Sequence, residues 1–168
     1  MNEPTLPYEE DPRLGSRHPS SYDRQQIIQS VTAFCEFLTE LPYVEPSEVL
    51  HPPENGWPNI TKQKLAALSK NDEVIELLAR LPYISTRGDE GWCMIAPNTH
   101  LLDFRGDSVQ KALEGGADLE NPPNYVPPFI ELPPWVVSLT TGGKHGWYLL
   151  LDTSDGTSAG FVIVPPST

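Results

Sequence analysis

Proline restricts the folding of this chain more than any other residue type, because 19 of its 168 residues are proline. A proline fixes its own φ angle and lacks the backbone donor that helices and inner strands require. The sequence therefore predicts short elements joined by extended connections. The clearest connection is the proline-rich stretch 118–134, which we expect to form an extended strap.

Length and charge limit the class of protein. A chain of 168 residues can bury one core without metals or disulfides, so we expect residues 21–168 to form a single domain. Residues 1–20 are polar and proline-rich, and we expect a flexible N-terminal arm there. The net charge of -12 argues against nucleic acid and anionic membranes as partners.

Targeting signals and cysteines bear on the compartment. The N-terminus lacks the basic and apolar regions of a secretory signal, and no apolar run is long enough to span a bilayer. Cys35 and Cys93 lie far apart in apolar patterns, which is typical of buried thiols in a reducing compartment. Together these features predict a cytoplasmic protein.

The first apolar pattern at helical spacing covers residues 27–38. Ser21 precedes it as a candidate N-cap, and Pro42 would stop the helix. Residues 36–44 recur in similar form as residues 76–84, each a helix end followed by Leu-Pro-Tyr. A shared capping geometry explains this echo, and a remote duplication is the alternative.

A second helical region follows a proline-rich loop. Thr61–Leu68 is expected to be a short helix, and another helix is expected to begin near Ser69 or Asn71. Pro82 would end that helix, because it cannot donate a backbone hydrogen bond. We expect Tyr83, the next residue, to pack back onto the core.

Strand patterns replace helical patterns in the second half of the chain. Residues 92–95 and 100–104 are predicted strands joined by a turn at residues 96–99. A further short apolar run covers residues 136–139. Between them, Asp107 is a candidate cap for a short helix.

The strongest strand pattern is the stretch 147–164, where two apolar runs flank Asp155 and Gly156. An Asp-Gly turn between such runs predicts a β-hairpin. Because Leu149–Leu151 are consecutive, we expect the first strand to lie centrally in its sheet with both faces covered. Helices first and strands later predict an α+β fold, with N-terminal helices packed on a small, mainly antiparallel sheet and proline-rich connections.

The sequence carries no motif for metal or cofactor binding. Its four histidines lack zinc-ligand spacing, and there is no Cys-x-x-Cys, so neither metal nor cofactor is expected. The loop Gly142–Gly146 lacks the residue order of a phosphate-binding loop, and no helical pattern follows it.

Acid–base chemistry needs only a carboxylate or a histidine in an apolar pocket, where burial shifts its pKa. Several such side chains lie beside aromatic residues or prolines. The candidate catalytic residues are Glu54, His100, Asp103, Glu131 and His145. Each has a structural alternative, as a solvated or hydrogen-bonded side chain.

Large aromatic residues on proline-stiffened connections are typical of a groove that binds a protein partner or an apolar small molecule. The candidate binding residues are Trp57, Trp92, Trp135, Trp147 and Tyr83. The same residues are equally suited to anchor the core, and the sequence leaves the oligomeric state open.

A set of motifs in the C-terminal part carries a family resemblance. These are Leu132–Trp135, the glycine loop at Gly142 and Gly143, the aromatic-aliphatic strand Trp147–Thr153, and the turn at Gly156. In these features the chain resembles SUKH (Smi1/Knr4-like) domains. Its Leu-Pro-Tyr steps also resemble those of small proteins of filamentous fungi. The resemblance implies a non-catalytic α+β protein-binding module of the cytoplasm.

Two functions fit these patterns. The first is a non-catalytic, SUKH-like interaction module. The alternative is a small cofactor-free enzyme of specialised metabolism, a cyclase, isomerase or hydrolase with a carboxylate or histidine in an aromatic-lined pocket. A deep pocket that holds a candidate acid would favour the enzyme, whereas a shallow apolar patch would favour the module.

Overall fold

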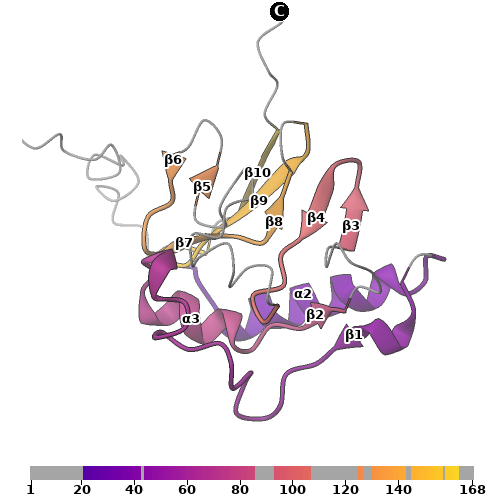
Figure 1. Ribbon diagram of the computed structural model, residues 1–168, viewed down its shortest axis with the longest axis horizontal. Coiled ribbons are helices and arrows are strands. Elements are labelled where there is room, and N and C mark those ends of the chain that lie inside the picture. The colour runs from indigo at the N-terminus through magenta and orange to yellow at the C-terminus, as the bar shows by residue number, and fades with distance from the viewer. Residues whose placement is uncertain are drawn as a thin grey trace, which may run out of the picture.

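The computed structural model describes residues 21–42, 44–85, 93–106, 125–126, 130–142, 145–156 and 158–162. In this part of the chain the fold is α+β, as predicted, with both α-helices in the first half and antiparallel strands in small sheets. Figure 1 shows the helices at one end of the strands, most of which stand above them. The predicted arm at residues 1–20 and the predicted helix after Asp107 lie outside the described residues.

Helix α2 (Arg24–Leu38) forms where the apolar spacing predicts it. Its N-cap is Asp23, whose carboxylate accepts from the backbone N–H of Gln26 at 3.0 Å. The expectation that Ser21 caps the helix is wrong, because the Ser21 hydroxyl donates to the carbonyl of Asp155 at 2.7 Å. The helix ends ahead of Pro42, at the C-cap Thr39.

Helix α3 (Asp72–Leu78) begins as predicted, with the side chain of Asn71 accepting from the Val74 backbone at 3.0 Å. The expected helix over Thr61–Leu68 is wrong, because only the 3-10 turn η3 (Ala66–Leu68) forms there. The left-handed Ser69, at φ 53°, ends that turn, which leaves too few residues to propagate an α-helix. Another 3-10 turn, η2 (Pro46–Glu48), precedes the first strand.

The described strands pair antiparallel in four small sheets. Two sheets have two strands each: β1 (Val49–Leu50) with β2 (Tyr83–Ile84), and β5 (Tyr125–Val126) with β6 (Ile130–Glu131). One three-stranded sheet has the order β3 (Cys93–Ala96), β4 (Thr99–Leu101), β8 (Thr140–Thr141). The other has the order β10 (Ser158–Val162), β9 (Trp147–Asp152), β7 (Val136–Ser138).

Three boundaries differ from the sequence prediction. The strand predicted over residues 100–104 ends at Leu101, because a turn follows it. The strap at residues 118–134 is interrupted by the β5–β6 pair, whose register joins Val126 to Ile130. The turn between β3 and β4 is shorter than expected, because Ala96 and Thr99 already pair with one another. Asn98 inside this turn has a positive φ of 53°, a conformation that asparagine tolerates well.

The predicted hairpin is confirmed as β9–β10, with Leu151 opposite Ser158. Gly156 takes a φ of +80° in its turn, which a side chain would strain. β9 lies between β10 and β7, so its central place in the sheet is also confirmed. The expectation that both its faces are covered is wrong for Leu149, which is 39% exposed because it lies beside a cavity.

Leu139 joins the two three-stranded sheets. β7 ends directly before it and β8 begins directly after it. Its backbone N–H donates to the carbonyl of Leu149 at 2.8 Å, and its carbonyl accepts from the N–H of Leu102 at 3.0 Å. One residue therefore hydrogen-bonds to β9 of one sheet and to the chain that follows β4 of the other.

The main hydrophobic cluster packs α3 against the turns before it and against the strands. Its members include four residues of α3 together with Tyr83, Phe104, Val137 and Leu151. Tyr83 packs onto the core as predicted, and its hydroxyl donates to the carbonyl of Leu78 at 2.7 Å. A smaller cluster holds the C-terminal end of α2 through Cys35 and Leu38.

Candidate functional site

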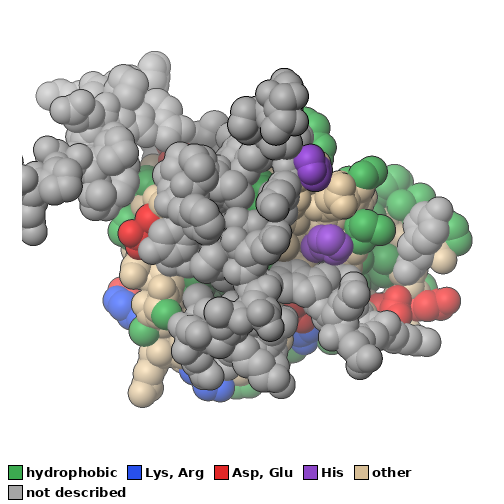
Figure 2. Space-filling view, turned by 45° about the horizontal axis from the view of Figure 1, so that its top comes forward, with side chains coloured by type: hydrophobic (Ala, Val, Ile, Leu, Met, Phe, Trp, Pro, Cys, Tyr) green, Lys and Arg blue, Asp and Glu red, His purple; other side chains and the backbone are tan. Residues whose placement is uncertain are grey.

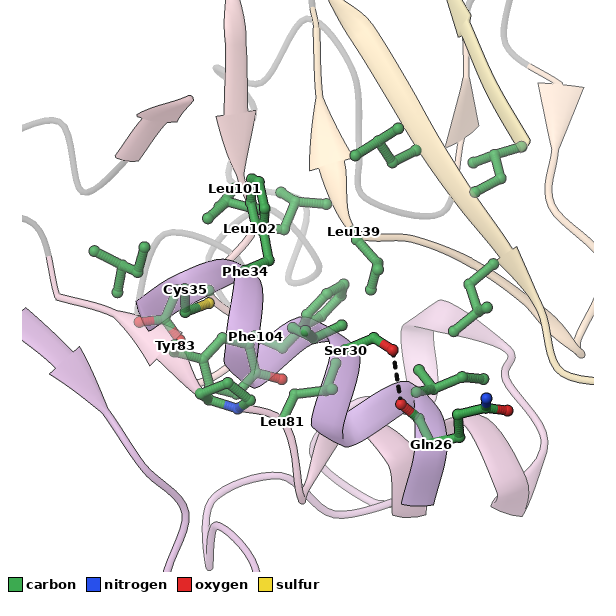
Figure 3. Close-up of a pocket in the computed structure, with 18 of the residues that line it drawn as sticks. Gln26, Ser30, Phe34, Cys35, Leu81, Tyr83, Leu101, Leu102, Phe104 and Leu139 are labelled. Carbon is green, nitrogen blue, oxygen red and sulfur yellow. Dashed lines mark hydrogen bonds between the residues drawn. The ribbon is translucent and has the colours of Figure 1, made fainter. Parts of the chain in front are cut away.

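A cavity of about 520 Å³ lies between α2 and the strands. This volume falls within the range of about 300–1,000 Å³ that is usual for small-molecule sites. Figure 3 shows side chains of α2 on one side of the cavity, with Leu101, Leu102 and Leu139 opposite. Most of the lining side chains are aliphatic or aromatic: Ile27, Val31, Phe34, Leu81, Pro82, Tyr83, Ile84, Leu101, Leu102, Phe104, Leu139, Leu149, Leu150 and Leu151.

The wall formed by α2 follows from its helical period. Lining residues recur three and four positions apart, which places them on one face of the helix. Val31 lies in the middle of this face, between Ile27 and Phe34. The polar side chains of Gln26 and Ser30 line one end of the cavity, and Phe34 lines the other (Figure 3).

Both ends of α2 are fixed to the rest of the fold. At the N-terminal end, Glu73 accepts from the Tyr22 hydroxyl at 2.8 Å and from both Nε and Nη2 of Arg24, at 2.7 and 2.8 Å. At the C-terminal end, Cys35 and Leu38 are buried. The cavity therefore lies beneath a helix that is held on either side of it.

The ion pair at Glu73 also shifts the pKa values of its members. The Arg24 guanidinium, which donates to the Glu73 carboxylate, holds the pKa of that carboxyl below its usual range. The pKa of Tyr22 is raised, mainly by burial and also by its hydrogen bond to Glu73. Both shifts favour the ionised carboxylate and the neutral phenol that this arrangement requires.

Substituting Glu73→Gln should lower the free energy of unfolding by about 1 kcal/mol, because it removes the charge that binds the Arg24 guanidinium of α2 and the Tyr22 hydroxyl just before the helix. A carboxyl whose pKa is depressed by folding stabilises the protein above its unfolded pKa, and the effect is lost as pH falls through the folded pKa. The difference between wild type and variant in urea unfolding should therefore shrink below about pH 4.

The neighbouring Asp72→Asn variant is the control for Glu73→Gln. The Asp72 side chain is exposed and holds an ion pair with Lys62 at 2.6 Å. We expect it to change the free energy of unfolding by less than about 0.5 kcal/mol. Equal losses in the two variants would contradict the role of Glu73 in fixing α2.

Asp103 is the candidate catalytic residue that reaches the cavity. Its two carboxylate oxygens accept from Nε and Nη2 of Arg105 at 3.0 and 2.7 Å, and Oδ1 also accepts from the Arg105 backbone at 2.9 Å. The Arg105 guanidinium in turn lies 4.4 Å from the ring centre of Trp57 and 5.2 Å from that of Tyr83. The fold thus brings together Asp103 and two predicted binding residues around an arginine.

The Arg105 cluster, made of Trp57, Tyr83, Asp103 and Arg105, is held by hydrogen bonds and ring contacts. The Trp57 indole donates to the carbonyl of Leu81 at 2.8 Å, and Arg105 stacks on both rings as a cation–π contact. No buried side-chain nitrogen or oxygen among the described residues lacks a hydrogen-bond partner. Asp103 is therefore paired with Arg105, which in turn packs on the two aromatic rings.

The lining thiol and phenol are uncharged near neutral pH. Burial raises the pKa of the Cys35 thiol to about 11, with a further contribution from nearby Cys93. Burial also raises the pKa of Tyr83 well above its usual value. A protonated thiol is a poor nucleophile, so neither group is prepared for covalent chemistry.

The other candidate catalytic residues lie away from the cavity. Glu54, Glu131 and His145 are exposed, and His100 is partly buried on β4, where it pairs with Thr141 of β8. None of the four lines the cavity. Among the described residues, no group of three His, Cys, Asp or Glu side chains is placed to hold a metal ion.

The remaining candidate binding residues are scattered. Trp135 packs against a third small cluster formed by Leu132, Val136 and Tyr148, while Trp147 is 48% exposed on β9. Trp92 lies outside the described residues. Figure 2 shows exposed apolar and histidine side chains close together on one face. No described tryptophan lines the cavity, so the cavity differs from the groove that was predicted from the tryptophans.

Two residues important in the structure were missed by sequence reasoning. Asp103 and Arg105 lie in a turn in which the Asp103 carboxylate accepts from the backbone N–H of Arg105, and an aspartate followed by a glycine three positions later is a turn signal that could have found this pair. Lys70 is only 6% exposed and donates to the carbonyls of Leu132 and Pro133 at 2.8 and 3.0 Å. Nothing in the local pattern marks Lys70, because its partners are distant in the sequence.

Comparisons of the chain with protein-family models, with curated proteins and with solved structures each gave no significant match. The resemblance to SUKH domains stays a prediction. In the described part of the chain, neither helix combines the length and apolar character needed to cross a membrane.

Proposed function

We propose that this protein is a cytoplasmic, non-catalytic binding module that holds an apolar small molecule in the cavity beneath α2. The observation that carries the proposal is a cavity of about 520 Å³ whose walls are mainly aliphatic. Burial of apolar surface is the main source of affinity at such a site. Of the two partner classes expected from the sequence, an apolar small molecule fits this shape best.

The chemistry of the lining supports binding without catalysis. A general acid or base must be within reach of substrate and free to exchange a proton. Asp103 is the carboxylate that lines the cavity, and three donors of Arg105 already occupy its oxygens. The SUKH-like character of the module rests on the sequence resemblance alone.

The enzyme alternative has one observation in its favour, which is the place of Asp103 in the lining. Catalysis by this carboxylate would require it to leave Arg105, because the guanidinium already donates to both of its oxygens. That requirement makes the binding module the better supported function.

Filling the cavity should weaken binding. In a fluorescence titration with the neutral dye Nile red, we expect Val31→Trp to weaken binding by about tenfold or more, because the indole would occupy the middle of the cavity. The control is Gln29→Trp, which adds the same indole at an exposed position of α2 outside the lining. Equal dye binding by wild type and both variants would contradict the proposal.

A further inference from the structure

We infer that the cavity selects an uncharged, mainly aliphatic molecule with one hydrogen-bonding head group, such as a long-chain alcohol, and discriminates against the carboxylate of the same chain length. The inference rests on the proposed function, because it specifies the ligand class of the same cavity.

The described lining holds no lysine, arginine or histidine. An ionised carboxylate that leaves water needs a cation or several donors to offset its lost hydration. The guanidinium of Arg105, beside the lining residue Asp103, is already bound to both oxygens of that carboxylate. A carboxylate ligand would therefore meet a like charge at Asp103 and no free cation in these walls.

The walls themselves disfavour negative charge. The pKa of the Cys35 thiol is raised to about 11, and that of the Tyr83 hydroxyl is raised well above its usual value, in both cases chiefly by burial. The Tyr83 hydroxyl donates to the carbonyl of Leu78, so it is the Cys35 shift that indicates poor solvation of an anion beside the α2 wall. An anionic head group that entered the apolar part of the cavity would experience the same penalty.

The polar end of the cavity, where Gln26 and Ser30 are exposed, suits a neutral head group. Ser30 donates its hydroxyl hydrogen to the carbonyl of Gln26 at 2.9 Å, which leaves the hydroxyl oxygen able to accept (Figure 3). The side-chain amide of Gln26 offers both a donor and an acceptor, and no hydrogen bond from it to another described residue is present. A hydroxyl or amide group can both donate to and accept from this pair.

The test is competition against Nile red with decanol, decanoate and decylammonium at about neutral pH, using the full chain. We expect decanol to displace the dye at a concentration at least about tenfold below that needed for decanoate or decylammonium. Decanoate that displaces the dye as well as decanol does would overturn the ligand class while leaving the cavity as a binding site. If wild type does not bind Nile red, or binds it no better than Val31→Trp does, the proposed function is overturned as well.

A charge introduced at the polar end should change the selectivity. Gln26→Lys places a cation in the lining, and we expect it to improve decanoate binding by about tenfold relative to decanol. Gln25→Lys adds the same charge to the same helical turn outside the lining and should leave the selectivity unchanged. Ser30→Lys repeats the test one turn along α2, and unchanged selectivity in both lining variants would overturn the inference.

Discussion

Substituting Phe104→Ala should lower the free energy of unfolding by about 3–5 kcal/mol. Phe104 is 1% exposed and belongs to the main hydrophobic cluster. Its ring also forms part of the cavity wall, so truncation adds empty space to a region where the surrounding chain already leaves a void. The loss is a large fraction of the stability of a typical domain, which is about 5–15 kcal/mol.

Urea unfolding followed by tryptophan fluorescence measures this change. The control is Phe37→Ala, which removes the same ring from a position on α2 that is 53% exposed. We expect that variant to change the free energy of unfolding by less than about 1 kcal/mol. Comparable losses in the two variants would show that the cluster around Phe104 does not form as described.

Removing the titratable amine of Lys70 should change how stability depends on pH. Burial lowers the pKa of Lys70 to about 8, and the nearby charge of Glu131 opposes that shift only in part. Between the folded pKa and the unfolded pKa of about 10.4, the unfolded chain binds the proton and the folded protein does not. The wild type should therefore gain stability as pH rises through this window.

Relative to that of Lys70→Met, the free energy of unfolding of the wild type should rise by about 2–3 kcal/mol from pH 7 to pH 10. Methionine preserves the apolar stem but cannot titrate or donate to the carbonyls of Leu132 and Pro133. Taking the difference between the two proteins cancels the opposite effect of Cys35, whose raised pKa is common to both. A difference that stays constant over this range would contradict a buried, titrating Lys70.

The parts of the fold that sequence predicts well are those fixed by neighbours along the chain. The hairpin β9–β10 follows from an Asp-Gly turn between two apolar runs, and α3 follows from the cap at Asn71 and its apolar period. The wrong prediction of Ser21 as the N-cap has a different origin. The Ser21 hydroxyl donates to the carbonyl of Asp155, which lies more than a hundred residues along the chain.

The candidate site depends on contacts that no local pattern encodes. Its cavity is assembled from α2, the chain around Tyr83, the segment Leu101–Phe104, and residues of β9. Asp103 was predicted as a reactive carboxylate from its type and its aromatic neighbour, but its function depends on Arg105 and on the rings that hold Arg105. Residue type alone cannot separate a paired carboxylate from a free one.

Leu139 separates two roles between its backbone and its side chain. Its backbone hydrogen bonds to Leu149 and Leu102 join the two three-stranded sheets, and the hydroxyls of Thr99 and Thr140 add further hydrogen bonds to β9. Its side chain lines the cavity. A change of side chain at this position therefore alters the shape of the cavity without removing a backbone link between the sheets.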